Sequence, residues 1–588
     1  DGFSAAPPST MTPDTVQTPP ELGNQYDTDR VLRSYLRRVL PDDVHAAVRP
    51  GLRAMGERAG HDLYELQQST LREEPTLTQW GPWGDRVDRI EVTEVWKRAE
   101  EIAAKEGVVA TAYEQTHGRH SRVHQMALAY LFIPSTDMYG CPLAMTDGAA
   151  RTLLDRGRES LVEAAVPHFT ARDPASFWTA GQWMTEVSGG SDVSNTRTTA
   201  RPTDGEAWRL YGRKWFTSAI TANVALALAR PDDNPPGSKG VALFYVPIRE
   251  GNALADGIYV NRLKDKLGTR KLPTAELTLD GATAYPVTDE LRHGTRAIAP
   301  MLTVTRTWNA VTAAAYLRRG VALARDYARK RTAFGNALLD QPLHQETLAD
   351  LQAQLEGMVH LAFRVAELLG HQEADTASEA DRALLRLLTP IAKLTTARQA
   401  VSGTSEVVEA FGGAGYIEDT GVPPLLRDAQ VLPIWEGTTN VLALDLLRTL
   451  GREEDALSPL HDEFKRCHAA VDVPALEEVT QTALEAFRET TAWLRRAREH
   501  EGAAVEAGAR VVALRLGHAL ERAYTARHAQ WALRTEQDAR SAAAAERLAK
   551  RPLPRLPDPA APSTAALAHD APSPALLDRY SSSAPAAS

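Results

Sequence analysis

The spacing of apolar residues changes twice along this chain, and that change limits the folds open to it. From about residue 27 to 174, apolar side chains recur at helical spacing, as Val31, Leu32 and Tyr35 do. Between about 177 and 286 they instead form short runs bounded by Gly, Pro, Asn or Asp, which is typical of strands. Helical spacing returns after residue 286. The pattern predicts a β-domain inserted between two helical parts.

The short runs of the middle segment lie too close together for long helices to connect them. Five or more strands joined by turns favour a mainly antiparallel domain, either a barrel or a sandwich. The runs that define these strands are 208–211, 224–228, 241–246, 258–260 and 275–279.

Long helices are expected after the β-domain, and Ala-rich stretches within them permit the close packing of a bundle. A further helical extension follows, while the two ends of the chain are rich in Pro, Ser or Ala and are expected to be disordered. The predicted helices are 301–331, 343–369, 379–411 and 441–450, with the extension at about 457–550. The predicted domains are a leader (1–26), a helical domain (27–176), a β-barrel domain (177–286), a helical bundle with a catalytic loop (287–450), a helical extension (451–550) and a tail (551–588).

The length, net charge and cysteine content of the chain disfavour several classes of function. A chain of 588 residues exceeds one compact core, so several domains are expected. The net charge of -10 gives no general attraction to nucleic acid or to anionic membranes. No run reaches the roughly 20 apolar residues of a spanning helix, so no membrane partner is expected. Two cysteines without metal-type spacing disfavour a disulfide framework and fit the reducing cytoplasm.

Three histidines invite a metal interpretation that the neighbouring charges oppose. His117, His120 and His124 have helix-compatible spacing, but Arg119 and Arg122 are interleaved with them. Because cations beside a site repel a metal ion, a structural or surface role is favoured. We expect no metal.

A glycine-rich turn stands where the helical pattern gives way to strands. It comprises residues 184–193, with Met184, Thr185 and Ser191 among them. Paired glycines let backbone N–H groups approach an anion, so a phosphate or pyrophosphate could rest there. A turn that merely enters the next domain is the alternative. The segment is not the G-x-G-x-x-G fingerprint of dinucleotide-binding βαβ units.

Two further segments combine structural and binding interpretations. Residues 212–218 end a strand with Phe216, Thr217 and Ser218, where an aromatic face and hydroxyls could meet a flat heterocycle. Core strand residues explain the same pattern. Residues 329–335 close a long helix with cations that the helix dipole favours, although Arg331 could also hold a phosphate.

One acid stands almost alone in a segment of low charge. Glu436 lies between Trp435 and Gly437, shortly after the bend expected at Pro433. Burial disfavours the charged form of a carboxylate and is one way in which enzymes prepare a general base. A solvated loop glutamate is the competing interpretation of this short motif.

The order of these motifs resembles the acyl-CoA dehydrogenase family from about residue 30 to 450. A T-E-x-x-G-G-S-D turn, K-W-F-T-S, R-T-A-F-G, F-G-G-A-G-Y, R-D-A and W-E-G-T follow one another along the chain. The segments 264–270 and 334–343, the W-E-G form of the acid motif and the helical extension are most similar to the AidB-like adaptive-response branch. The expected fold is therefore mainly α with a central antiparallel β-domain, as in that family, plus a C-terminal helical extension.

The resemblance implies a flavoenzyme with FAD between the β-domain and the bundle, in a homotetramer built as a dimer of dimers. Glu436 matches the catalytic base, and Arg306 matches a substrate-binding position. Ser218 matches the hydroxyl that faces flavin N5, with Thr217 as the alternative one residue away. The residues matching cofactor-binding positions are Met184, Thr185, Ser191, Phe216, Thr217, Ser218, Thr438 and Asn440, and, across the subunit interface, Arg331, Phe334, Gln341, Gly412 and Gly413.

The implied reaction is dehydrogenation of an acyl thioester carried by CoA or a carrier protein. Glu436 would remove the α-proton while the β-hydride leaves for flavin N5. An electron-acceptor flavoprotein is then an expected partner. Thr305 and Arg306 offer no carboxylate where some branches place their base, which favours Glu436. Glu409 and Gln182 depart from the family pattern and leave an ordinary acyl-CoA substrate less certain than FAD.

Two other functions compete with this one. AidB-like relatives associate with DNA through the helical extension, but its arginines at 495–527 alternate with glutamates, which disfavours strong phosphate binding. A flavin monooxygenase or oxidase on the same scaffold is the third candidate, because fold does not determine function.

Overall fold

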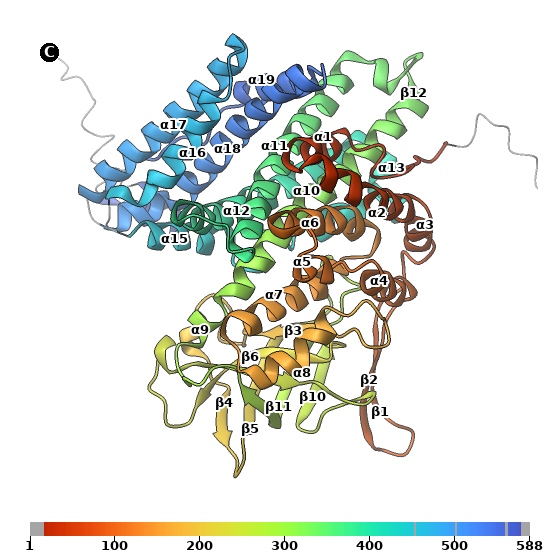
Figure 1. The fold of residues 1–588 in the computed structure, drawn as a ribbon, viewed down its shortest axis with the longest axis vertical. Helices are drawn as coiled ribbons and strands as arrows, with labels where there is room; N and C mark the ends of the chain where they lie inside the picture. Colours follow the sequence, from red (N-terminus) through yellow and green to blue (C-terminus); the bar gives the residue numbers. More distant parts are fainter. Residues whose placement is uncertain (1–16, 452–453, 500–501, 559–562, 575, 578–588) are drawn as a thin grey trace, which may run out of the picture.

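The computed structural model describes most of the chain as helices around one sheet domain (Figure 1). The described residues are 17–451, 454–499, 502–558, 563–574 and 576–577. Helices occupy the upper part of the view in Figure 1 and the sheet occupies the lower part. The predicted fold class, mainly α with a central β-domain, is confirmed.

The N-terminal helices pack around a continuous apolar core that extends into the bundle. A hairpin interrupts them, formed by β1 (Thr76–Trp80) and β2 (Arg86–Glu91). The prediction had no strand here. The helices are α1 (Arg30–Val39), α2 (Asp42–Gly60), α3 (Asp62–Ser69), α4 (Glu94–Lys105), α5 (Ala110–Glu114), α6 (Ser121–Phe132), α7 (Gly140–Arg156) and α8 (Glu159–Phe169).

Five strands of the central sheet form a closed ring. The order β11-β5-β4-β6 is completed by β7, which pairs with both β6 and β11. Most pairings are antiparallel, but β6 is parallel to β3 and to β4. Ring interior positions are apolar and buried, including Leu210, Phe244 and Leu277. The strands are β3 (Ala180–Trp183), β4 (Thr199–Pro202), β5 (Trp208–Ser218), β6 (Val224–Pro231), β7 (Ala242–Pro247), β10 (Ile258–Leu263) and β11 (Thr274–Pro286), with the short pair β8 (Arg249–Glu250) and β9 (Ala253–Leu254).

Three helices of 32 residues each dominate the bundle after the sheet. The last of them begins at a capping box, in which Ser378 and Asp381 satisfy each other's backbone N–H groups. The elements are α9 (Gly294–Ala297), α10 (Ala299–Lys330), β12 (Thr332–Ala333), β13 (Asn336–Ala337), α11 (Pro342–Glu373), α12 (Glu379–Ala410), α13 (Gly413–Tyr416), α14 (Pro423–Ala429) and α15 (Thr439–Leu450).

The helical extension lies against α11, α12 and α15, at the upper left of Figure 1. Its helices are α16 (Ser458–Ala469), α17 (Pro474–Glu499), α18 (Gly502–Thr535) and α19 (Arg540–Lys550), and the short helix α20 (Ser563–Ala568) follows in the tail. Residues 551–558 of the tail pack on the extension, since Pro557 O accepts a hydrogen bond of 2.6 Å from Trp493 Nε1. Most of the leader and much of the remaining tail lie outside the described residues.

Two further results concern the described residues alone. None of their helices combines the length and the apolar character that crossing a bilayer requires. They also contain no group of three or more His, Cys, Asp or Glu side chains arranged to hold a metal ion.

Candidate functional site

The structure places Glu436 in a loop between α14 and α15. The residue is half-buried, which lies between the enclosed carboxylate and the solvated loop glutamate that the sequence left as alternatives. Thr305 on α10 donates a hydrogen bond of 2.7 Å from Oγ1 to Glu436 Oε2. The carboxylate is thus oriented by the helix on which other branches of the family were expected to carry their base.

The side chain of Arg306, the neighbour of Thr305, contacts a backbone carbonyl of the same loop. Its Nε donates to Glu436 O at 3.2 Å, and its Nη2 lies 3.0 Å from Asp445 Oδ2 on α15. The guanidinium therefore ties α10 to the base loop and to the following helix. This geometry supports a role in holding the loop, while the predicted substrate contact of Arg306 stays a prediction.

Cys141, at the start of α7, is influenced by charges from the Glu436 loop and from Lys266 in the loop before β11. Ser218 Oγ lies 3.1 Å from Thr274 Oγ1, which in turn accepts a 3.0 Å hydrogen bond from Lys266 Nζ. Burial raises the pKa of the Cys141 thiol to about 12, with Glu436 raising it further and Lys266 lowering it. Lys266 is thus linked to the end of β5 through Thr274, and it and Glu436 both influence the Cys141 thiol.

Strand alternation separates the two hydroxyl candidates on β5. Thr217 points into the ring, is fully buried and donates to Ala275 O at 2.8 Å. Phe216 and Ser218 face the other way, and 49 % of Phe216 is exposed. Only the outward pair offers an aromatic face and a hydroxyl to a bound ring, so the geometry favours Ser218 over Thr217.

The glycine-rich turn after β3 is anchored by a buried ion pair. Glu186 Oε1 lies 2.9 Å from Lys214 Nζ on β5, and its other oxygen accepts from Arg197 N at 2.8 Å. Thr185 O also accepts from the β5 backbone, at Trp215 N. Met184 and Thr185 are half-buried, whereas Ser191 is exposed. The turn is held rigidly next to β5 and keeps an open outer surface.

The remaining predicted cofactor residues form two groups, one at the start of α15 beside the Glu436 loop and one at the end of α10. Thr438 is the N-cap of α15, directly after the base loop, and its side chain accepts from Val441 N. Asn440 is exposed, and its Oδ1 accepts from Arg510 Nη1 of the extension at 3.1 Å. The extension therefore reaches the edge of the site, a contact that the sequence pattern did not indicate.

The other group lies at the far end of α10, away from Glu436. Thr305 and Arg331 are 26 positions apart, or about 39 Å along a helix. Phe334, in the β12–β13 hairpin, is 96 % exposed. A single chain therefore does not bring these residues to its own Glu436. The far group consists of Arg331, Phe334, Gln341, Gly412 and Gly413.

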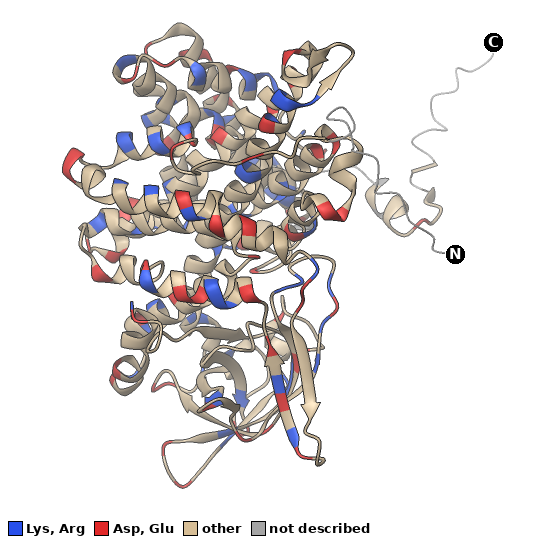
Figure 2. Ribbon diagram, turned by 90° about the vertical axis from the view of Figure 1, so that its right-hand side faces the viewer, with Lys and Arg blue, Asp and Glu red and all other residues tan. Residues whose placement is uncertain are grey.

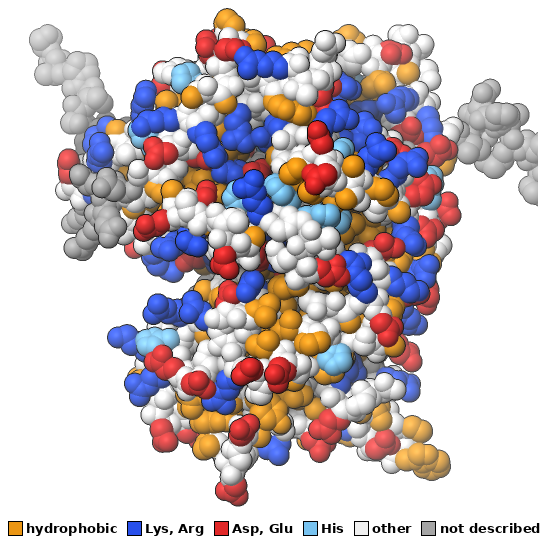
Figure 3. All heavy atoms as spheres, in the orientation of Figure 1, with side chains coloured by type: hydrophobic (Ala, Val, Ile, Leu, Met, Phe, Trp, Pro, Cys, Tyr) orange, Lys and Arg blue, Asp and Glu red, His pale blue; other side chains and the backbone are white. Residues whose placement is uncertain are grey.

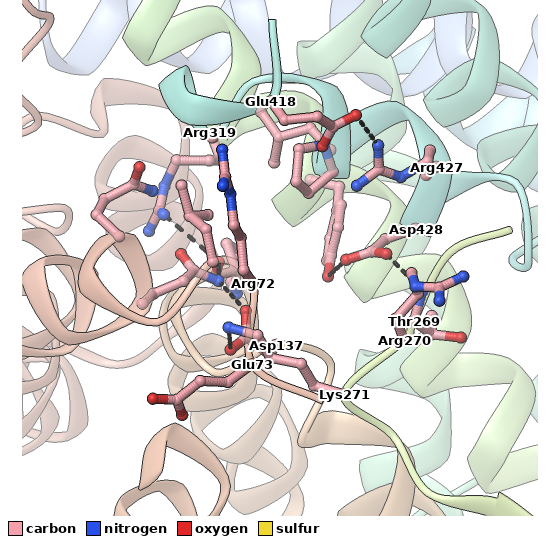
Figure 4. A pocket seen from close by; sticks show the side chains of 18 of the residues that line it. Arg72, Glu73, Asp137, Thr269, Arg270, Lys271, Arg319, Glu418, Arg427 and Asp428 are labelled. Carbon is pink, nitrogen blue, oxygen red and sulfur yellow. Dashed lines mark hydrogen bonds and ion pairs between the residues drawn. The ribbon is translucent and has the colours of Figure 1, made fainter. Parts of the chain in front are cut away.

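A separate cavity of about 600 Å³ lies between α3, the loop at 266–271, α10 and α14 (Figure 4). None of the predicted site residues lines it. Asp428 on its wall accepts from Thr269 N at 2.5 Å, and burial raises the pKa of Asp428 to about 6. Other charges of the wall form pairs, such as Lys271 with Asp137 at 2.8 Å. The cavity wall combines charged side chains with apolar ones such as Leu267 and Leu323.

Sequence reasoning missed Lys393 as part of the site. Lys393 lies in α12, and its Nζ contacts the loop that carries Glu436. The available signal was a single charge in the apolar run 387–397 of a bundle helix, where burial without a functional reason is rare.

Comparison with known proteins gives three family matches that together span most of the chain. The matched models are the AidB N-terminal domain of the adaptive-response protein (residues 17–173), the acyl-CoA dehydrogenase middle domain (181–282) and the acyl-CoA dehydrogenase C-terminal domain (292–451).

Individual relatives agree with these models. Acyl-CoA dehydrogenase family member 11 of Caenorhabditis elegans is 45 % identical over 450 residues, covering 75 % of this chain and 73 % of its own. AidB of Escherichia coli (strain K12) is 30 % identical, covering 70 % and 76 %.

Solved structures give the same result. ACDH-11 of Caenorhabditis elegans, in complex with C11-CoA, has a TM-score of 0.89 and 38 % identity, covering 94 % of this chain and 95 % of its own. Bd2924, in its apo form, has a TM-score of 0.81 and 44 % identity, covering 87 % and 99 %. The family matches indicate a flavoprotein oxidoreductase with FAD as cofactor. From its sequence relatives and its architecture, the chain belongs to the acyl-CoA dehydrogenase family, in the AidB-like branch.

Proposed function

We propose that this protein dehydrogenates an acyl thioester, with Glu436 as the base that removes the α-proton. The observation that carries the proposal is the 2.7 Å hydrogen bond between Thr305 and the Glu436 carboxylate. The bond uses one carboxylate oxygen and holds the side chain against α10, while the second oxygen has no hydrogen bond within the described residues. A positioned base of this kind contributes on the order of 10²–10⁴-fold to the rate.

The residues around Glu436 fit FAD. Phe216 offers an exposed ring, and Ser218 offers a hydroxyl on the same face of β5. Trp435 Nε1, next to the base, is a buried donor that lacks a partner among the described residues. When bound, FAD supplies the acceptor for the β-hydride. The protein's part is to hold the thioester beside Glu436 and to remove the proton.

The substrate class comes from the relatives and is part of the proposal. The nematode relative was solved with C11-CoA, so an acyl-CoA is our first candidate and a carrier-bound acyl group the second. A second flavoprotein would then accept the electrons. Both cysteines are free and buried, which fits the reducing cytoplasm as the compartment.

We also propose a homotetramer, built as a dimer of dimers, in which each far group completes a neighbour's site. The observation that supports it is exposed apolar surface around the end of α10: Phe334, Leu343 and Tyr416 are each more than four-fifths exposed. Exposed apolar groups of this size commonly mark protein contacts. Arg331 would then supply a cation to FAD in the adjoining subunit.

DNA binding by the extension is the weaker alternative. Arg522 is buried, Arg515 pairs with Glu489, and Arg510 contacts Asn440. Lys and Arg alternate with Asp and Glu over the helices (Figure 2), and the face in Figure 3 mixes both signs. Arg522 is thus unavailable to phosphates. The exposed arginines, among them Arg495, Arg496 and Arg498, alternate with glutamates, so we expect no strong salt-sensitive shift of duplex DNA.

The test is the variant Glu436→Gln, which keeps the shape of the side chain and removes its basicity. We expect the variant to retain FAD while the rate of flavin reduction by an acyl-CoA panel falls on the order of 10²–10⁴-fold. Absorbance of the flavin under anaerobic conditions measures both. Full activity would rule out Glu436 as the base, and rapid peroxide formation in air would favour an oxidase instead.

A further inference from the structure

The loop that carries Glu436 has an unfavourable backbone conformation. Glu436 has φ of 57°, and Gly437 follows with φ of 101°. Glycine adopts such angles readily, but a residue with a side chain is held in the left-handed region at a cost of order 1–3 kcal/mol. Neighbouring groups must therefore fix this conformation.

Two cations from two helices supply that restraint. Lys393 on α12 donates from Nζ to Trp435 O and to Gly437 O, both at 2.7 Å. Arg306 on α10 donates to the carbonyl between them, Glu436 O. Three consecutive carbonyls thus accept hydrogen bonds from side-chain N–H groups of α10 and α12.

The two cations differ in what balances their charge. Arg306 pairs with Asp445 at 3.0 Å. Lys393 is fully buried and makes no ion pair within the part of the chain that the structure describes. Burying an ammonium group without a paired carboxylate is costly. Burial accordingly lowers the pKa of Lys393 to about 7, an effect that Arg306 adds to and Glu436 opposes. The two hydrogen bonds to the Trp435 and Gly437 carbonyls are the interactions that Lys393 gains in return for this unfavourable burial.

We propose that Lys393 is a positioning residue that holds the left-handed bend at Glu436 through the carbonyls on either side of it. The inference rests on the proposed role of Glu436 as the base. Without Lys393 the two carbonyls lose their donor, the loop relaxes toward ordinary φ values, and the carboxylate leaves the position that Thr305 defines. Misplacement of a catalytic group by about 1 Å can cost on the order of 100-fold in rate.

The experiment compares Lys393→Met, Lys393→Ala and Glu436→Gln in the FAD-loaded protein. We expect Lys393→Met to bind FAD and acyl-CoA within about threefold of wild type, while the rate of flavin reduction falls on the order of 100-fold. Lys97→Met, which changes an exposed lysine on α4, is the matched control and should leave the rate unchanged. An unchanged rate in Lys393→Met would overturn the proposal.

Two further arms separate positioning from a general structural role. A primary alkylamine should restore part of the rate in Lys393→Ala, and tetramethylammonium, which has no N–H, should not. In a Glu436→Gln background, Lys393→Met should cause no further loss. Equal rescue by both ions, or an additional loss in the double variant, would contradict the inference. Full activity of Glu436→Gln alone would instead remove the proposed function.

Discussion

At the scale of single residues, the site depends on hydrogen bonds that no motif contains. Glu436 was identified from its W-E-G setting, but Thr305, which binds its carboxylate, is 131 positions away in the chain. Lys393, which binds the neighbouring Trp435 carbonyl, is 42 positions from that residue. Such pairings depend on how α10 and α12 pack, and local sequence carries no information about them. The sequence left the burial of Glu436 open for the same reason.

Lys393 also gives stability a specific pH dependence. Its pKa is about 7 in the folded protein and near 10.5 in an unfolded chain, so between these values the unfolded state binds the extra proton. The free energy of unfolding therefore rises with pH across this window, by at most about 1.4 kcal/mol per unit.

Lys393→Met removes that contribution. The unfolding midpoint of wild type relative to Lys393→Met should increase when both are measured at pH 7, 8 and 9. Midpoints that shift in parallel would show that Lys393 keeps an ordinary pKa.

At the scale of elements, strands with an apolar face were predictable and those without one were not. The runs at 224–228 and 241–246 correspond to β6 and β7, two strands of the ring whose residues are mostly buried. The hairpin of β1 and β2 was missed because its residues are mostly exposed and carry no continuous apolar pattern. The G-P-W-G turn between its strands was the signal available.

The β12–β13 hairpin allows a test of the proposed assembly. Phe334 has φ of 52° and an almost fully exposed ring, an arrangement that a partner surface would stabilise. We expect Phe334→Asp to reduce the oligomer and to weaken FAD binding, since the charge would be buried at the contact. Phe334→Leu, which stays apolar, should retain both. Light scattering gives the mass, and an unchanged mass in Phe334→Asp would contradict the assignment.

At the scale of the whole molecule, a buried ion cluster joins the N-terminal helices to the bundle. Arg122 on α6 binds Glu373 on α11 through two hydrogen bonds of 2.8 and 2.6 Å and also binds Asp147 on α7. Trp308 on α10 donates to the same aspartate at 2.7 Å. Three regions far apart in sequence therefore meet in one network that sequence patterns could not reveal.

Removing the cation from this cluster should lower the free energy of unfolding strongly. Arg122→Met leaves two buried carboxylates without their partner, and we expect a loss of about 3–5 kcal/mol in the free energy of unfolding. Arg72→Met, which breaks an exposed pair with Asp419, should cost less than about 1 kcal/mol. Chemical denaturation of both variants measures the difference, and similar losses would show that the cluster adds little.

Helix α10 has a consequence for how the protein works as an assembly. Thr305 near one end touches the proton acceptor of its own subunit, while Arg331 at the other end faces outward for the proposed neighbour. In the proposed assembly, helix α10 contributes residues to two catalytic centres. An isolated protomer would then lack the residues that its neighbour supplies. Specific activity should accordingly decline on dilution below the concentration at which the subunits associate.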